Sequence, residues 1–182
     1  KVTGGQRIDL LGIKKADLNA RDLEHARELA SHLAPGSSQY QLFTAAVDWR
    51  EGRHVLARAN LEALESRDPL PVEAMIAPAF LRAEVAADEG LDAEAVDALR
   101  RFQRLPFQPY WRSWAYPRSL FLLARSLDRL GKREEARAEL DRLLRLWEHA
   151  DQDLPLLSDA RALKARLDAR AAEGTNGGKP FG

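Results

Sequence analysis

Small and apolar residues recur at fixed distances from three glycines, Gly52, Gly90 and Gly131. Alanine lies seven residues before and five residues after each glycine, leucine lies nine after it, and a large apolar residue lies twelve after it. In chain order these residues are Ala45, Ala83 and Ala124; Ala57, Ala95 and Ala136; Leu61, Leu99 and Leu140; and Leu64, Phe102 and Leu143. The three glycines are 38 and 41 residues apart. Self-similarity at such a period is typical of stacked helix pairs. The pattern predicts an all-α protein with three antiparallel helix pairs, at about residues 38–68, 71–105 and 117–149.

The glycines and alanines have different roles in such a pair. A glycine between two helices adopts positive φ and ends the first helix in a tight turn. Small side chains on the facing sides let the two backbones approach closely, while the leucines lie on one face of the second helix and fill the space beyond it. We therefore expect the glycines in the left-handed region and the alanines at helix crossings.

Helical spacing continues on both sides of the three pairs. It predicts one helix over 17–33 and a last helix over 156–171 that caps the open end of the stack. Ser38 with Gln41 has the form of a capping box, and Asp92 is placed to cap the helix after Gly90. Residues 1–172 are expected to form a single repeat domain, and 173–182 a flexible tail.

Composition narrows the class of protein. The chain of 182 residues has no cysteine, which excludes disulfides, zinc–thiolate sites and cysteine nucleophiles. No stretch is apolar enough to span a bilayer, so we expect a cytoplasmic protein without a membrane partner. The first residue is Lys1 rather than methionine, and we expect the chain to be a fragment or a processed product.

Although the net charge is zero, the chain has one acidic and one basic segment. Residues 60–99 carry ten acidic and two basic side chains, whereas residues 100–145 carry twelve basic and five acidic ones. Neighbouring repeats of opposite charge either attract one another along the stack or offer a basic surface to a partner with acidic segments. Solvated helix faces with modest mutual attraction are the simpler interpretation.

The Ala-x6-Gly-x4-Ala-x3-Leu spacing around each turn resembles the tetratricopeptide repeat (TPR), and Pro69 matches the proline that closes such a repeat. The resemblance covers about residues 38–150. It departs near the end of the first helix. The family has an aromatic residue there, whereas this chain has Asp48, Ala86 and Leu127. The resemblance implies a right-handed α-solenoid that binds a protein or peptide. Residues 147–155 are also similar to the C-terminal ends of TPR regions in multidomain bacterial signalling proteins such as serine/threonine kinases.

In TPR-like stacks the first helix of each pair lines a concave groove, and the resemblance assigns groove positions here. Their aromatic and charged members are Trp49, Arg50, Phe80, Glu84, Asp88, Arg118, Phe121, Arg125 and Arg129. Apolar anchors ringed by charge are the mix expected of a peptide-binding surface. Alternatively, the aromatic side chains pack against neighbouring helices and the charges are solvated.

A second candidate surface is the aromatic segment between the second and third pairs, with Tyr110, Trp111, Trp114 and Tyr116. It either fills a gap between the pairs or binds a partner protein. Stacking on single-stranded nucleic acid is a third interpretation, but no fold for that purpose accompanies it, and we expect no nucleic-acid partner.

Catalytic chemistry has little support in the sequence. The four histidines lack metal-ligand spacing, and no phosphate-binding glycine loop, nucleophile elbow or kinase motif occurs. We therefore expect no metal and no cofactor, and predict a non-enzymatic scaffold that binds a protein or peptide. The alternatives are the regulatory arm of a bacterial signalling enzyme whose catalytic domain precedes this chain, and a sensor that encloses a small molecule between Trp49, Phe80 and Arg125.

Overall fold

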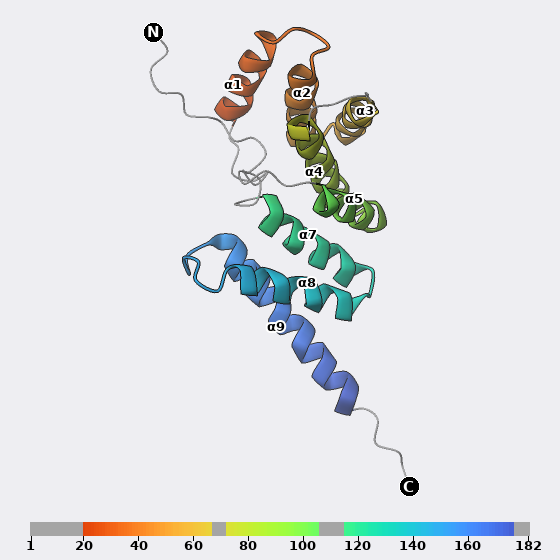
Figure 1. Ribbon diagram of the computed structural model, residues 1–182, viewed down its shortest axis with the longest axis vertical. Helices are drawn as coiled ribbons and strands as arrows, with labels where there is room; N and C mark the ends of the chain where they lie inside the picture. The colour runs from red at the N-terminus through yellow and green to blue at the C-terminus, as the bar shows by residue number, and fades with distance from the viewer. Residues whose placement is uncertain (1–19, 67–71, 106–114, 177–182) are drawn as a thin grey trace. The chain divides into compact units, whose positions relative to one another are not determined.

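The computed structural model describes residues 20–66, 72–105 and 115–176 (Figure 1). Within these residues the regular structure is entirely helical, with no strand, which confirms the all-α prediction. The chain divides into two compact units, Lys1–Gln108 and Pro109–Gly182. Each unit is described by itself, and the single continuous repeat domain stays a prediction.

Unit 1 contains two of the predicted helix pairs. Its helices are α1 (Ala20–Ser31), α2 (Ser38–Arg50), α3 (His54–Glu65), α4 (Val72–Asp88) and α5 (Asp92–Arg104). The most extensive contacts join α2 to α3 and α4 to α5, as the repeat pattern predicts. Further contacts join α3 to α4 and α1 to α2, so the helices pack in chain order.

Unit 2 contains the third pair and the last helix. Its helices are α7 (Ala115–Arg129), α8 (Arg133–Leu146) and α9 (Pro155–Asn176). The helices α7 and α8 pack against each other most extensively, and α9 contacts both. Since α9 continues through Asn176, the predicted tail was placed too early: residues 173–176 are helical, and 177–182 lie outside the described residues.

The three turn glycines have the conformation expected of them. Gly52, Gly90 and Gly131 have φ of 80°, 75° and 76°. In each turn the N–H of the residue after the glycine donates to the carbonyl of the residue four positions before the glycine. The three N···O distances are 2.7, 2.9 and 2.9 Å. This is the long bond of a Schellman motif, which satisfies a carbonyl at the end of the first helix. The three pairs therefore share one turn geometry between their two helices.

Replacing Gly131 with alanine should lower the free energy of unfolding by about 1 kcal/mol, because the residue must keep a left-handed backbone. A methyl group at this position would meet no atom within 4 Å, so crowding adds nothing to that cost. Urea unfolding followed by circular dichroism measures the loss. Gly131→Asn should lose less, because asparagine tolerates positive φ. Equal stability of the alanine variant and the wild type would contradict the turn assignment.

Both predicted caps are wrong by one residue. The N-cap of α2 is Ser37 rather than Ser38, and its hydroxyl accepts a hydrogen bond from the Tyr40 N–H at 3.1 Å. Asp92 is the first residue of α5 rather than its cap, and the N-cap Leu91 makes no side-chain cap. Asp92 still favours the start of α5, because a negative charge in the first turn interacts well with the helix dipole.

The repeated apolar positions form the core of each pair. Every alanine, leucine and phenylalanine of the repeat pattern is at most 1% exposed. Close-packed alanines at a helix crossing leave no room for larger side chains, because protein interiors are packed as densely as organic crystals. The sequence pattern therefore identified the contacts that hold each pair together.

Ion pairs within unit 1 neutralise part of its acidic character. Arg82 pairs with Glu65 at 2.8 Å and with Glu94 at 3.6 Å, and Arg58 pairs with Glu89 at 3.2 Å. Burial lowers the pKa of Arg82, but the hydrogen bond and charge of Glu65, with the charge of Glu94, raise it by more. The pKa of Arg82 therefore lies above its ordinary value, and these pairs connect α3, α4 and α5.

In unit 2, ion pairs attach α9 to its neighbours. Lys164 contacts Asp141 of α8 at 3.0 Å and Asp168 of α9 at 3.4 Å, and Arg166 contacts Asp128 of α7 at 3.1 Å. The hydrogen bond to Asp141 raises the pKa of Lys164 against the lowering effect of burial, and Asp168 raises it further. The helix α9 thus packs on the third pair through apolar residues and charged rims together.

Candidate functional site

The structure brings three predicted groove residues of unit 1 together at the ends of α2 and α4. The Trp49 indole N–H donates to the Asp88 carboxylate at 3.2 Å. The Arg50 guanidinium carbon lies 3.9 Å from the centroid of the Trp49 ring, a cation–π contact. Trp49 therefore connects the two first helices through its ring and its single donor.

Burial places the two aromatic groove candidates of unit 1 in its core. Trp49 is 1% exposed and packs in a cluster that includes Leu61 and Leu81. Phe80 is 0% exposed, and its ring lies 5.0 Å from that of Phe102 between α4 and α5. Both rings fill the space between helices, as in the alternative interpretation of the sequence, and neither presents an open face to solvent.

The charged groove candidates of unit 1 differ in exposure. Arg50 and Glu84 are buried, whereas Asp88 is exposed at the end of α4. Because Arg50 and Glu84 are buried, their side chains are part of the packing of α2 and α4. A buried charge is costly unless it has partners.

In unit 2 the predicted groove residues lie along one face of α7. We name Arg118, Phe121, Arg125 and Arg129 the basic stripe, because their spacing places them on the same side of the helix. Arg129 is exposed and the other three are partly exposed. The opposite face of α7, with Leu120, Leu123 and Leu127, is buried. The stripe therefore leaves Phe121 and the three arginines at least partly exposed.

The aromatic segment is described only at its end. Tyr116 is a residue of α7, which begins earlier than predicted, at Ala115. Its hydroxyl accepts a hydrogen bond from Arg142 of α8 at 2.7 Å, and Arg142 also pairs with Glu139. Tyr116 thus helps to join the third pair. Tyr110, Trp111 and Trp114 lie outside the described residues.

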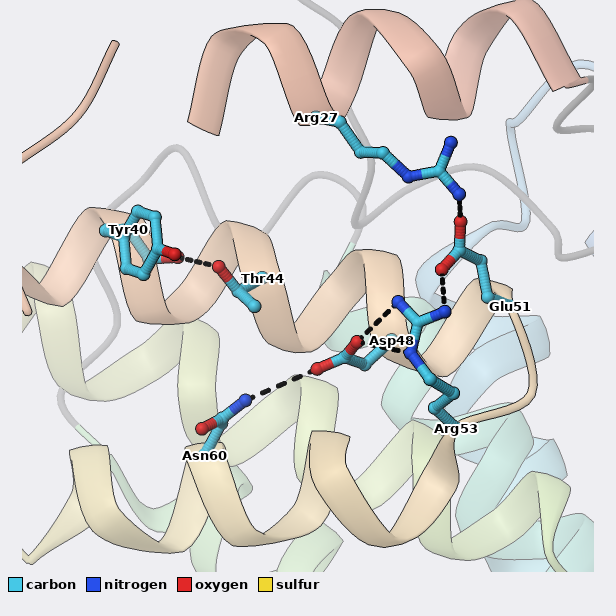
Figure 2. Close-up of polar contacts among 7 residues, drawn as sticks. All are labelled: Arg27, Tyr40, Thr44, Asp48, Glu51, Arg53 and Asn60. Carbon is cyan, nitrogen blue, oxygen red and sulfur yellow. Dashed lines mark hydrogen bonds and ion pairs between the residues drawn. The ribbon is translucent and has the colours of Figure 1, made fainter. Parts of the chain in front are cut away.

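A pocket between α1, α2 and the start of α3, with polar and apolar lining residues, was not predicted from the sequence. Its volume is about 250 Å³. Figure 2 shows the polar side chains around it, which come from three successive elements. The lining residues are Arg27, Ala30, Ser31, Tyr40, Thr44, Val47, Asp48 and Arg53.

A chain of charged contacts crosses one wall of this pocket (Figure 2). Arg53 donates to Asp48 through Nε at 2.8 Å and contacts it through Nη2 at 2.7 Å. Arg53 also pairs with Glu51, which pairs in turn with Arg27 of α1. On its other side Asp48 accepts a bond of 3.4 Å from Asn60 of α3. The network links α1 to the first pair through side chains alone.

Other kinds of site find no support in the part of the chain that the structure describes. Within residues 20–66, 72–105 and 115–176, no group of three or more His, Cys, Asp or Glu side chains is placed to hold a metal ion. No helix in those ranges is long and apolar enough to cross a membrane. Comparison of the chain with protein-family models, with curated proteins and with solved structures gives no match.

Proposed function

We propose that this chain is a non-enzymatic scaffold that binds a protein or peptide. In this proposal the three helix pairs are antiparallel and stack as a right-handed, TPR-like solenoid capped by α9, and the first helix of each pair lines the binding surface. The observation that supports it best is the basic stripe: α7 packs through its leucine face and leaves Arg118, Phe121, Arg125 and Arg129 at least partly exposed.

The chemistry of the stripe suits an acidic peptide with an apolar residue. Phe121 offers a ring for an apolar side chain, and binding energy in such surfaces concentrates on a few aromatic and arginine side chains. The three arginines attract acidic side chains during the approach of the peptide and fix its orientation. Phe121 is therefore the proposed anchor, while Trp49, Arg50, Phe80 and Glu84 support the scaffold from within unit 1.

The test begins with selection of peptide ligands from a displayed random library on the intact chain. Reversal of two charges, Arg125→Glu with Arg129→Glu, should slow association of the selected peptides on the order of tenfold at low salt, because long-range attraction raises association rates. Added salt should weaken the wild-type interaction and narrow this difference. Phe121→Ala should mainly speed dissociation. Surface plasmon resonance separates the two rates.

The matched control is Arg133→Glu with Arg145→Glu, which reverses two exposed charges on α8 of the same unit. These variants should leave both rates close to the wild-type values. If the selected peptides bind the Arg125/Arg129 variant as fast as the wild type, the stripe is not the binding surface. Loss of binding only on replacement of Trp111 and Trp114 would assign the function to the aromatic segment instead.

A further inference from the structure

Near the turn, the first pair has a buried carboxylate where the other two pairs have apolar side chains. Four residues before the turn glycine, the second and third pairs have Ala86 and Leu127, which are 0% and 1% exposed. The first pair has Asp48 there, and it is only 6% exposed. A buried carboxylate is unfavourable unless it is paired and hydrogen-bonded. Departures from the local packing rule are expected mainly at functional sites, so this position directs attention to the pocket beside it.

The two carboxylate oxygens of Asp48, which lines the pocket, have unequal partners. Both close contacts from Arg53 go to the same oxygen, Oδ1, at 2.7 and 2.8 Å. The other oxygen, Oδ2, accepts only the long 3.4 Å bond from Asn60 among the contacts of the described residues. A carboxylate oxygen has two lone pairs, so Oδ2 is able to accept a stronger hydrogen bond from a ligand.

The other walls of the pocket offer a ring, hydroxyl groups and apolar carbon. The Thr44 hydroxyl donates to the Tyr40 carbonyl at 2.8 Å, and the Ser31 hydroxyl donates to a carbonyl of its own helix at 2.7 Å. Both hydroxyl oxygens therefore act toward a ligand as acceptors. Ala30 and Val47 add apolar surface, and Tyr40 adds its ring. A few polar groups on a partly apolar wall are typical of small-molecule sites.

Charge and size restrict the ligand. The two arginines, Arg27 and Arg53, face two carboxylates, Asp48 and Glu51, so the formal charges of the network cancel. An anionic ligand would come close to the carboxylates and be repelled by them. A cationic ligand would be repelled in the same way by the guanidinium groups. The volume of about 250 Å³ has room for several water molecules and limits the ligand to a small molecule. A neutral molecule of monosaccharide size fits both restrictions.

We propose that the pocket between α1 and α2 binds a neutral, hydroxyl-rich small molecule of about monosaccharide size. The Asp48 carboxylate and the Thr44 hydroxyl accept hydrogen bonds from ligand hydroxyls, Arg27 donates to ligand oxygens, and the Tyr40 ring packs on the carbon skeleton. This site is independent of the proposed peptide-binding function, because it lies on α1 and α2 of unit 1 and uses no residue of the basic stripe.

The first experiment compares three sugars that share one ring and differ in charge: glucose, glucosamine and glucuronate. Each is titrated into the intact chain, with binding followed by the amide NMR signals of Tyr40, Thr44 and Val47. Glucose should shift these signals with a dissociation constant in the millimolar range and should bind at least about fivefold more tightly than either charged sugar. Tighter binding of glucuronate or glucosamine would contradict the proposal, as would the absence of any shift with all three.

Three substitutions then locate the site without removing a core side chain. Thr44→Val keeps the shape of the side chain, Tyr40→Phe keeps the ring, and Arg27→Gln changes a side chain that is more than half exposed. Thr44→Val and Arg27→Gln should each weaken glucose binding several-fold, because each removes a hydrogen-bonding group. Tyr40→Phe should change binding little, because the proposed role belongs to the ring.

The matched controls are Tyr116→Phe and Arg166→Gln in unit 2. Arg166 resembles Arg27 in exposure and in its pairing with a carboxylate. Circular dichroism should show an unchanged helical signal for every variant. If Arg27→Gln and Thr44→Val bind glucose as tightly as the two controls, the sugar lies elsewhere and the proposal fails. The stripe variants should bind glucose as the wild type does, even where they lose peptide binding. The experiments therefore test the two proposals independently.

Discussion

Replacing Trp49 with alanine should lower the free energy of unfolding by about 3–5 kcal/mol, the usual cost of removing a large buried ring. Trp49 is 1% exposed, packs against α3 and α4, and donates its indole N–H to Asp88. The substitution removes the ring from the core, opens a cavity between α2 and α4, and deprives Asp88 of a donor. Urea unfolding monitored by circular dichroism measures the loss without relying on tryptophan fluorescence.

Trp49→Phe separates packing from hydrogen bonding. It keeps most of the buried apolar surface and removes the N–H, so its cost should be much smaller than that of alanine, about 1–2 kcal/mol. A different result would follow if Trp49 were an exposed anchor for a partner. Trp49→Ala would then leave stability nearly unchanged and abolish binding of the selected peptides. That outcome would contradict the core assignment.

Introducing leucine at the helix crossings is the second large perturbation. Ala83→Leu, Ala124→Leu and Ala136→Leu should each cost about 1–3 kcal/mol, because added carbon atoms must separate two closely packed helices. All three alanines are 0% exposed. Thermal and urea unfolding of the single variants gives the values.

The chain supplies controls for this experiment. Ala138 lies two residues after Ala136 in α8 but is exposed, and Ala93 is exposed near the start of α5. Ala138→Leu and Ala93→Leu should change the free energy of unfolding by less than about 0.5 kcal/mol, as is usual for surface positions. Equal effects at crossing and exposed alanines would mean that the helix pairs are not held by close backbone contact.

The sequence predicted the elements that depend on local chemistry. A turn that needs positive φ selects glycine, and a close crossing selects alanine, so Gly52, Gly90 and Gly131 and the alanines around them were identified correctly. The helix caps were harder to predict from the sequence. Ser37 and Ser38 are adjacent and have the same side chain, and the backbone conformation at the helix start decides which one accepts the hydrogen bond.

The candidate site was predicted less completely because it depends on contacts between distant parts of the chain. Whether Trp49 and Phe80 face a groove or a neighbouring helix is decided by the helices packed around them, and helical spacing alone does not contain that information. The pocket combines Arg27 and Asp48, which lie on different helices. Its one signal in the sequence was Asp48, the polar residue at a position that is apolar in the other two pairs.

The proposal that the first helices form the peptide-binding surface is tested most directly by hydrogen–deuterium exchange of the intact chain. Exchange is measured with and without the tightest peptide selected on it, and mass spectrometry resolves the individual helices. Bound peptide should slow amide exchange most strongly in α7, residues 115–129, because the peptide lies over Arg125 and Phe121. Slowed exchange confined to α8 and α9, with α7 unchanged, would contradict the account.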